Sequence, residues 1–266
     1  MRPPRICFAG GVYHVTTRCN NQEFLFQTED DFILFLEKLQ LGKQKYDVAI
    51  YAYSVMDNHV HLLVGTPFPS PQKENGKAKK KKGQNEKGPE DPTLSLFMQY
   101  VNGTYAQAYN REHDRSGHFW SERFHSTIIQ TETQLFDTML YIELNRVRCK
   151  AVQHPSEWKW SSYNAHAHGK HDPILDVHPL FLELGSTPEA REKAYREMCE
   201  ARMIERGYKR DPRYTSGVVL GSESFVRGII EEFGQKIRYY LNRKIYGSQE
   251  QGYSLYRPEQ SAKSPG

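Results

Sequence analysis

The sequence has few cysteines, and their spacing lacks the pairs that a disulfide framework or a zinc knuckle requires. A single short-spaced pair would have been enough to suggest either kind of site, and none is present. We therefore expect reduced thiols without a structural role as ligands. The cysteines are Cys7, Cys19, Cys149 and Cys199.

Long hydrophobic runs and a strong charge of one sign are also missing. No run approaches the length of a membrane span, and the short apolar stretch after residues 1–4 is interrupted by Gly10 and Gly11, unlike a signal-peptide core. We therefore predict a cytoplasmic protein without a membrane partner. The chain has 36 Lys and Arg against 32 acidic residues, a formal net charge of +4, which permits an anionic partner without requiring one.

What the chain does contain is enough apolar material for a substantial core. Its 266 residues are 38% hydrophobic, which fits one large domain or a domain with an appendage. We predict a main domain over residues 1–168 and a mainly helical accessory region over residues 169–266. The basic, tyrosine-containing stretch 236–244 of that region suits nucleic-acid contact or the packing of an amphipathic helix.

The stretch 48–64 is predicted to form the centre of a sheet. Residues 48–56 are almost continuously apolar or aromatic, as in a strand buried on both faces. Asp57 and Asn58 then offer side chains that tolerate the left-handed conformation of a tight hairpin turn, and residues 59–64 read as the returning strand. Two adjacent antiparallel strands are expected.

Two histidines of the returning strand are candidate metal ligands. Alternate side chains of a strand point the same way, so His59 and His61 share one face while Val60 and Leu62 share the other. Imidazoles two residues apart on a strand lie about 6 to 7 Å from each other and can bind one divalent cation. Histidines that are merely hydrogen-bonded in the fold are the alternative.

The flanking elements complete a ferredoxin-like, split βαβ arrangement. The order is βαββαβ, which predicts an α+β fold with both helices on the Val60 and Leu62 face of the sheet and the other face open for a ligand. The expected elements are a strand at residues 12–18, a helix from Thr28 to Gly42, the hairpin, a helix from Pro92 to His113 and an extended stretch at residues 119–130.

A basic insertion at residues 67–92 separates the hairpin from the second helix. Residues 73–87 hold seven Lys against two Glu. Such a segment is either a solvated linker or an arm that contacts phosphates. Under the second interpretation the phosphate contacts would come from Lys79, Lys80, Lys81 and Lys82.

A third helix, predicted over residues 132–148, carries the candidate nucleophile. Tyr141, Asn145 and Arg148 lie on one polar stripe, because they are three or four residues apart. A tyrosine next to a carboxamide and an arginine suits a nucleophile beside a metal ligand and a phosphate clamp. A tyrosine that covers the edge of the core is the alternative.

These residues resemble a known family. His59–His61 together with Tyr141–Asn145 is similar to the single-tyrosine HUH transposases, in particular the REP-associated tyrosine transposases. The resemblance spans roughly residues 5 to 165, and its elements occur in the family's order. Arg146 departs from it, standing where the family usually has proline, and the insertion is longer. The matching segments are residues 11–18, 56–61, 117–124, 141–148 and 160–163.

The resemblance implies a fold, a reaction and a set of residues. The fold would be that of HUH endonucleases, and Tyr141 would cleave single-stranded DNA at a REP-like hairpin, forming a 5′-phosphotyrosine link and a free 3′-OH. His59, His61 and Asn145 would bind Mg²⁺ or Mn²⁺. The oligomeric state is left open, a homodimer included. Further DNA contacts are predicted for Arg18, Arg123 and Arg148.

Two other functions stay open from the sequence. His14–Thr16 and His125–Thr127 are two His-x-Thr tripeptides on predicted strands, a pair that metal-free phosphoesterases of RNA ends use. Thr17 and Ser126 stand where that family has apolar residues. The third possibility is a nucleic-acid-binding regulator on the same sheet that has lost its chemistry.

Overall fold

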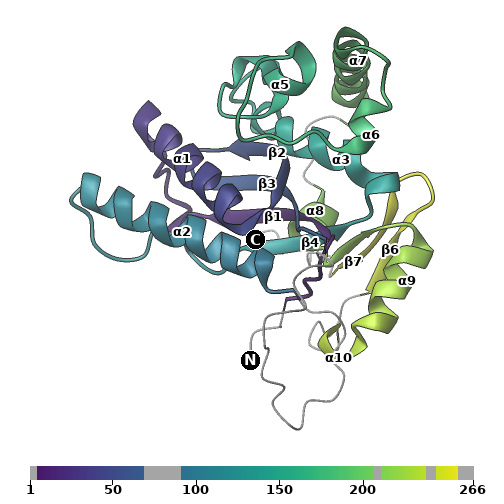
Figure 1. Cartoon of the computed structure of the whole chain (residues 1–266), viewed down its shortest axis with the longest axis horizontal. Coiled ribbons are helices and arrows are strands. Elements are labelled where there is room, and N and C mark those ends of the chain that lie inside the picture. Colours follow the sequence, from purple (N-terminus) through teal and green to yellow (C-terminus); the bar gives the residue numbers. More distant parts are fainter. Residues whose placement is uncertain (1–4, 69–90, 207–210, 238–243, 257–266) are drawn as a thin grey trace, which may run out of the picture.

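The computed structural model describes residues 5–68, 91–206, 211–237 and 244–256, and the described strands form one seven-stranded mixed sheet (Figure 1). Its strand order is β2-β3-β1-β4-β5-β7-β6, and β4 and β5 are parallel whereas the other neighbours are antiparallel. Among the described helices none is both long and apolar enough to cross a membrane.

The strands are β1 (Val12–Arg18), β2 (Ala49–Val55), β3 (His59–Gly65), β4 (His125–Ile129), β5 (Val219–Gly221), β6 (Lys244–Ser248) and β7 (Gly252–Tyr256). The helices are α1 (Glu29–Tyr46), α2 (Thr93–Glu112), α3 (Thr131–Glu143), α4 (Asn145–Arg148), α5 (Tyr163–His168), α6 (Pro179–Leu182), α7 (Pro188–Arg206), α8 (Pro212–Ser216), α9 (Glu223–Glu232) and α10 (Gly234–Ile237). Two 3₁₀ turns are η1 (Asn20–Gln22) and η3 (Pro155–Glu157).

The first four strands and two helices have the predicted ferredoxin-like arrangement. Their order along the chain is β1-α1-β2-β3-α2-β4, and their order in the sheet is β2-β3-β1-β4. Helices α1 and α2 lie together on one face of these strands (Figure 1). The α+β fold predicted from the βαββαβ pattern is therefore confirmed.

Helix α1 begins where the sequence predicted and ends later. Thr28 accepts a hydrogen bond from the backbone N–H of Asp31, and the Asp31 carboxylate accepts one from that of Thr28, which is a capping box. Gly42 does not end the helix, which continues to Tyr46. A Cβ at Gly42 would lie 2.7 Å from Val101 Cγ2, so the glycine permits α1 and α2 to approach closely.

The apolar core under α1 and α2 is formed by the face of the sheet that the alternation pattern predicted. Val60 and Leu62 of β3 are buried there together with Phe35 of α1 and Phe97 of α2. Because these side chains are all apolar, this half of the fold follows directly from the periodicity of the sequence.

The β2–β3 hairpin turns without a left-handed residue. Neither Asp57 nor Asn58 has a positive φ, so the expected left-handed turn is wrong. The turn is instead held by the surrounding backbone, since the N–H of Cys19 donates to the carbonyl of Asn58 at 2.8 Å and that of Phe26 donates to the carbonyl of Asp57 at 3.0 Å.

The second face of the sheet is covered as well. Helix α3 contacts β2 and β3, and α8 contacts β4 and β7. The single helix predicted over residues 132–148 is interrupted at Leu144, so that α3 ends at Glu143 and α4 begins at Asn145. The expectation that this face would be open was wrong, because α3 and the chain beyond residue 168 pack on it.

The region after residue 168 is rich in helices, as predicted, but it also extends the sheet. Strand β5 pairs with β4, and the β6–β7 hairpin continues from β5 (Figure 1). These strands were not predicted. The boundary at residue 168 between two domains stays a prediction, and the structure adds that both sides of it contribute strands to one sheet.

Candidate active site

A row of polar side chains runs across β3, β1 and β4 on the sheet face opposite α1 and α2. Arg18 is paired with His59 and Thr16 with His61 between β1 and β3. Thr16 is also paired with His125 of β4. Directly opposed residues of antiparallel strands project from the same face, so these five side chains lie on one surface. The predicted common face of the two histidines is therefore present.

His61 lies against a second imidazole, that of His14. The two rings are stacked with centroids 5.0 Å apart, and His14 Nε2 lies 2.8 Å from His61 Nδ1. Burial lowers the pKa of His14 to about 3. Burial also lowers the pKa of His61 well below its ordinary value, with further contributions from His14 and His59 and from the charges of Arg148 and Arg18. Both buried rings are therefore neutral at physiological pH.

The hydrogen-bond partners favour the same tautomer for both candidate ligands. His59 Nδ1 lies 2.6 Å from Asn58 Oδ1, an acceptor, so the neutral ring carries its proton on Nδ1. When His61 Nδ1 donates to His14 Nε2, His61 has the same tautomer. In that arrangement the lone pair of each ring is on Nε2. In metal sites, a hydrogen-bond partner at the ring nitrogen that does not bind the metal fixes the orientation of the histidine ring.

Tyr141 of α3 lies next to His14 and His61. Its ring centroid is 6.0 Å from that of His61 and 5.8 Å from that of His14, both in edge-on orientation. Tyr141 is only 8% exposed. Its face is stacked on Tyr214 of α8, with centroids 4.1 Å apart and planes inclined by 18°. The structure thus brings the candidate nucleophile to the histidines, beneath a second aromatic ring.

Arg148 and Asn145 flank Tyr141 on the same short segment. The Arg148 guanidinium lies 3.9 Å from the centre of the Tyr141 ring and donates a hydrogen bond of 2.9 Å to the Tyr141 carbonyl. Asn145 is buried, and its Oδ1 lies 3.7 Å from Cys149 Sγ. The place of Asn145 as a third metal ligand stays a prediction.

A small polar cavity of about 190 Å³ opens at the end of the polar row. Two of the arginines predicted to contact DNA, Arg18 and Arg123, line it together. The cavity adjoins the histidines because Arg18 is the strand partner of His59. Its lining residues are Thr16, Arg18, Glu122, Arg123, His125 and Thr215. The other predicted DNA contacts, Lys79, Lys80, Lys81 and Lys82, lie outside the described residues.

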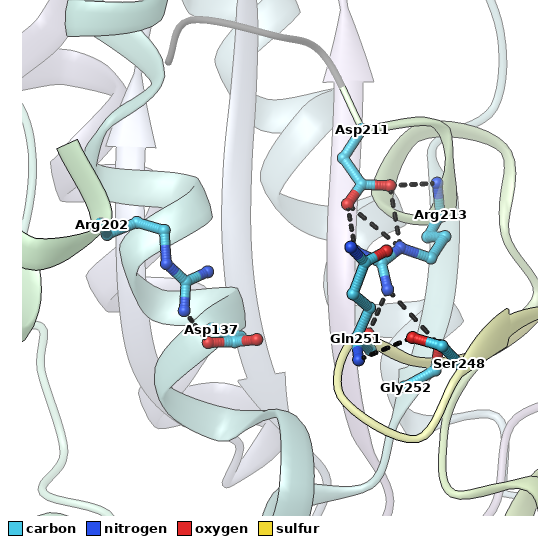
Figure 2. Close-up of polar contacts among 7 residues, drawn as sticks. All are labelled: Asp137, Arg202, Asp211, Arg213, Ser248, Gln251 and Gly252. Carbon is cyan, nitrogen blue, oxygen red and sulfur yellow. Dashed lines mark hydrogen bonds and ion pairs between the residues drawn. The ribbon is translucent and has the colours of Figure 1, made fainter. Parts of the chain in front are cut away.

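The segment with α8 is held over the polar row by contacts at both ends. Thr127 Oγ1 and His125 Nε2 donate hydrogen bonds of 2.8 and 2.9 Å to the carbonyl of Gly217. At the other end Asp211 binds the Arg213 guanidinium, which also reaches the β6–β7 turn at the carbonyl of Gln251 (Figure 2). The position of Tyr214 is therefore set by the fold of the C-terminal region.

Helix α7 is tied to α3 by a separate ion pair. Arg202 of α7 contacts Asp137 of α3, four residues before Tyr141, and both side chains are mostly buried (Figure 2). Figure 2 shows two separate polar contacts: the Arg202–Asp137 pair attaches the C-terminal region to α3, and the Asp211–Arg213 contacts join the α8 segment to the β6–β7 turn within that region.

Three residues of this neighbourhood were missed or misjudged from the sequence. His14 was considered for the His-x-Thr alternative, whereas its observed partner is His61. Tyr214 and Glu143, which is described below, were not singled out at all. The contact of His14 depends on the β1–β3 register and that of Tyr214 on strands β5–β7, and neither has a local sequence signal.

The donor set of His59 and His61 fits a divalent metal ion in its chemistry. A neutral imidazole with its lone pair on Nε2 binds metal, and the Nδ1 contacts of His59 and His61 are compatible with that form. In the described part of the chain no group of three or more His, Cys, Asp and Glu side chains is arranged to hold a metal ion. The predicted metal ligands include only two side chains of these types, His59 and His61, because the third predicted ligand is the carboxamide of Asn145.

The two His-x-Thr tripeptides lie side by side on β1 and β4. His14 is paired with Thr127 and Thr16 with His125. Each histidine has another partner, however, because His14 contacts His61 and His125 contacts the Gly217 carbonyl. The two tripeptides are therefore adjacent, as the phosphoesterase alternative requires, but both imidazoles contact other groups of the protein.

Comparison with known proteins finds a family that is similar to the N-terminal part of the chain. Residues 7–77 match the model of the family described as IS200-like transposases. The matched residues include β1, α1, β2 and β3, with His14, His59 and His61. The N-terminal part of the chain, about a quarter of its length, is therefore similar to IS200-like transposases. No curated protein matches the chain.

Solved structures give two further similarities. One is a REP-associated tyrosine transposase bound to a REP hairpin, at 17% identity over 67% of this chain and 92% of that chain, with a TM-score of 0.48. The other is a candidate transposase of Deinococcus radiodurans R1, at 17% identity over 54% of this chain and 96% of that chain, with a TM-score of 0.32.

Proposed function

We propose that this protein is a metal-dependent transposase that cleaves and rejoins single-stranded DNA at hairpin sequences through a 5′-phosphotyrosine intermediate. The observation that carries the proposal is the meeting of Tyr141 with His61, at a ring distance of 6.0 Å. The two residues come from elements separated by the whole of α2 and β4. An IS200-like family match over the histidine strand supports the same reading.

In the proposed reaction Tyr141 is the nucleophile. Its hydroxyl oxygen attacks the phosphorus of the scissile bond, the bond to the 3′ oxygen breaks, and that oxygen leaves as a 3′-OH after taking a proton. Free tyrosine has a pKa near 10, so only about a thousandth is ionised at pH 7 and the site has to favour the attacking form. The positive charge of Arg148 against the Tyr141 ring acts in that direction.

His59, His61 and Asn145 would hold the metal ion, Mg²⁺ or Mn²⁺. Such an ion polarises a non-bridging phosphate oxygen. His14 and Asn58 orient the two imidazoles through their Nδ1 atoms. The phosphotyrosine bond keeps the free energy of the phosphodiester, so a 3′-OH from another end can reverse the attack and join new ends without ATP.

Arg18 and Arg123 would bind the DNA backbone beside the scissile phosphate. Both line the cavity that adjoins the histidines, and guanidinium groups recognise phosphate oxygens well. The expected substrate is single-stranded DNA with a REP-like hairpin. A cytoplasmic location and a homodimer, both compatible with this substrate, stay predictions.

A regulator that binds DNA without cutting it is the second candidate, and one observation favours it. Tyr141 is only 8% exposed and its ring is stacked on Tyr214, so little of its surface is accessible to a phosphate. The same fold could then bind a hairpin through its basic residues alone. The two functions differ in a covalent adduct, which only the transposase forms.

The experiment is an adduct assay with single-stranded oligonucleotides that contain a hairpin. The wild type with Mn²⁺ should give a denaturation-resistant protein–DNA adduct, and Tyr141→Phe should abolish it while hairpin affinity stays within about threefold, because only the attacking oxygen is lost. Tyr214→Phe is the matched control, since it removes a hydroxyl from the ring stacked on Tyr141 and should keep the adduct.

Each other outcome identifies an alternative. An adduct that persists in Tyr141→Phe would mean that another residue is the nucleophile. Hairpin binding without any adduct from the wild type would support the regulator. Cleavage that survives excess EDTA would support the metal-free His-x-Thr chemistry.

A further inference from the structure

Glu143 is a carboxylate inside an otherwise apolar part of the fold. It is the last residue of α3 and is fully buried, between Ile142 and Leu144, which are also buried. A buried carboxylate is costly unless hydrogen bonds satisfy it. Glu143 lies between the candidate nucleophile Tyr141 and the candidate ligand Asn145, so the hydrogen bonds that satisfy its carboxylate also restrain this segment.

Three donors from outside α3 satisfy the Glu143 carboxylate. Ser162 Oγ donates to Oε1 at 2.5 Å, and His166 Nδ1 contacts the same oxygen at 2.7 Å. Tyr195 of α7 donates its hydroxyl to Oε2 at 2.7 Å. All three donors are buried, and charge-assisted hydrogen bonds of this kind are strong and directional. The end of α3 is thus attached at a fixed point.

The Ser162 contact attaches this point to the sheet. The backbone N–H of Ser162 donates to the carbonyl of Tyr53 at 3.0 Å, and the N–H of Tyr53 donates to Ser162 Oγ at 3.0 Å. The N–H of Val55 donates to the carbonyl of Trp160 at 2.9 Å. Residues 160–163, one of the segments singled out in the sequence, therefore bind the edge of β2, next to the histidine strand β3.

The Tyr195 contact attaches the same point to the C-terminal region. Helix α7 also binds α3 at Asp137 through Arg202, so two contacts hold the helices together (Figure 2). Successive residues of an α-helix are rotated by about 100°, so Glu143 points about 200° away from Tyr141 around α3. The carboxylate holds the helix from its back while Tyr141 faces the histidines from its front.

We infer that Glu143 is a positioning residue for strand transfer, because Ser162, His166 and Tyr195 fix its carboxylate and thereby the orientation of Tyr141 toward His61. This inference rests on the proposed function for its catalytic consequence. Helix ends open locally more easily than helix centres, and the nucleophile lies in the last turn of α3. The attachment at Glu143 keeps that turn in one conformation.

The test compares two tyrosines of the same apolar cluster. Tyr195→Phe removes one donor to Glu143, whereas Tyr163→Phe removes a buried hydroxyl that interacts with Cys199. The ring centroids of the two tyrosines are 6.5 Å apart and both side chains are fully buried, so Tyr163→Phe controls for the loss of a buried hydroxyl in the same cluster. Glu143→Gln, which keeps the shape of the side chain, is the second variant.

The expected result is a loss of rate without a loss of binding. Tyr195→Phe and Glu143→Gln should slow single-turnover adduct formation by about 10- to 100-fold, the effect of a small misplacement of a nucleophile, while hairpin affinity stays unchanged. Tyr163→Phe should keep the wild-type rate. Equal rates for Tyr195→Phe and Tyr163→Phe would overturn the inference.

Hydrogen exchange separates this inference from the proposed function. Amides of residues 139–148 should exchange faster in Tyr195→Phe and Glu143→Gln than in the wild type or in Tyr163→Phe, whether or not any of them cleaves DNA. If the wild type forms no adduct while this exchange pattern is found, the proposed function fails and the attachment at Glu143 stands. Unchanged exchange in both variants would overturn the attachment itself.

Discussion

The two faces of the N-terminal half of the sheet are both buried, but by different means. The face under α1 and α2 is apolar, with Phe35, Val60, Leu62 and Phe97 fully buried. Burial of such side chains needs only shape complementarity, and many apolar sequences with the same alternation would satisfy it. This face holds the fold together and has no chemistry to perform.

The opposite face has an apolar cluster too, with Leu63 and Met139, but it also buries polar groups, and each of these needs a specific partner. His14 is matched by His61, and Glu143 by donors that include Tyr195. When one partner of a buried hydrogen bond is removed, the polar group left behind lowers the free energy of unfolding. Replacing both partners by apolar groups of the same shape costs less. The difference teaches that both faces contribute to the stability of the fold, whereas the geometry of the site depends on residues of the second face.

The sharpest test of this difference uses two neighbours on β3 that point to opposite faces. His61→Ala should reduce adduct formation by more than about 1,000-fold, or roughly 4 kcal/mol of transition-state free energy, because one imidazole cannot hold the metal ion in place. Val60→Ala should cost about 2 kcal/mol of the free energy of unfolding and keep the activity of each folded molecule. Urea unfolding and the adduct assay on both variants measure this. A similar loss of activity in both would break the comparison.

Truncation of a larger side chain on the apolar face should destabilise the protein without changing the rate of adduct formation. Phe35 is fully buried, and its ring packs edge-on against Tyr105 and Phe26 at centroid distances of 5.2 and 5.7 Å. Phe35→Ala should lower the free energy of unfolding by about 3 to 5 kcal/mol through lost contacts and a cavity. Denaturant titration gives the value. A defect in adduct formation at temperatures where the variant is fully folded would contradict the prediction.

Replacing a buried carboxylate on the apolar side, that of Asp31, should change the free energy of unfolding by a modest, pH-dependent amount. Asp31 is almost fully buried; burial raises its pKa, but hydrogen bonds from the backbone of Thr28 and Gln27 and from His113 outweigh this, so that the pKa is lowered. A carboxyl whose folded pKa is depressed stabilises the fold above its unfolded pKa of about 3.9 and loses this contribution as the pH falls through the folded value.

Asp31→Asn should therefore cost about 1 to 3 kcal/mol at pH 7, and the difference from the wild type should shrink below about pH 4. Chemical denaturation at a series of pH values measures it. A difference that stays constant down to the acid transition would mean that the ionised carboxylate is not the stabilising form. Unlike changes at Glu143, this substitution should leave adduct formation per folded molecule unchanged.

The first four strands and the two helices of the apolar face could be predicted because their signals are local. Alternation along residues 59–64, the acidic first turn after Thr28 and the apolar spacing of α2 each specify an element without reference to the rest of the chain. Gly42 misled the prediction, since a glycine that ends a helix and one that admits a neighbouring helix look alike in sequence.

The site could be predicted only in part, because its geometry depends on contacts between distant segments. His59, His61 and Tyr141 were found from motif and resemblance, and the structure brings His61 and Tyr141 together. The burial of Tyr141 could not be foreseen, because Tyr214 reaches it through α8. That helix is placed by strands as short as β5, whose three residues carry almost no periodic signal.

The stacking of Tyr214 on Tyr141 has a consequence for the order in which the protein is made. A ribosome releases the chain from the N-terminus, so β1, β3 and α3 emerge before α8 and strands β5–β7. Tyr214 follows Tyr141 by roughly 70 residues, which take about 4 to 14 seconds to synthesise. During that interval the nascent chain already carries His14, His61 and Tyr141, while the ring that later covers the tyrosine has not been made.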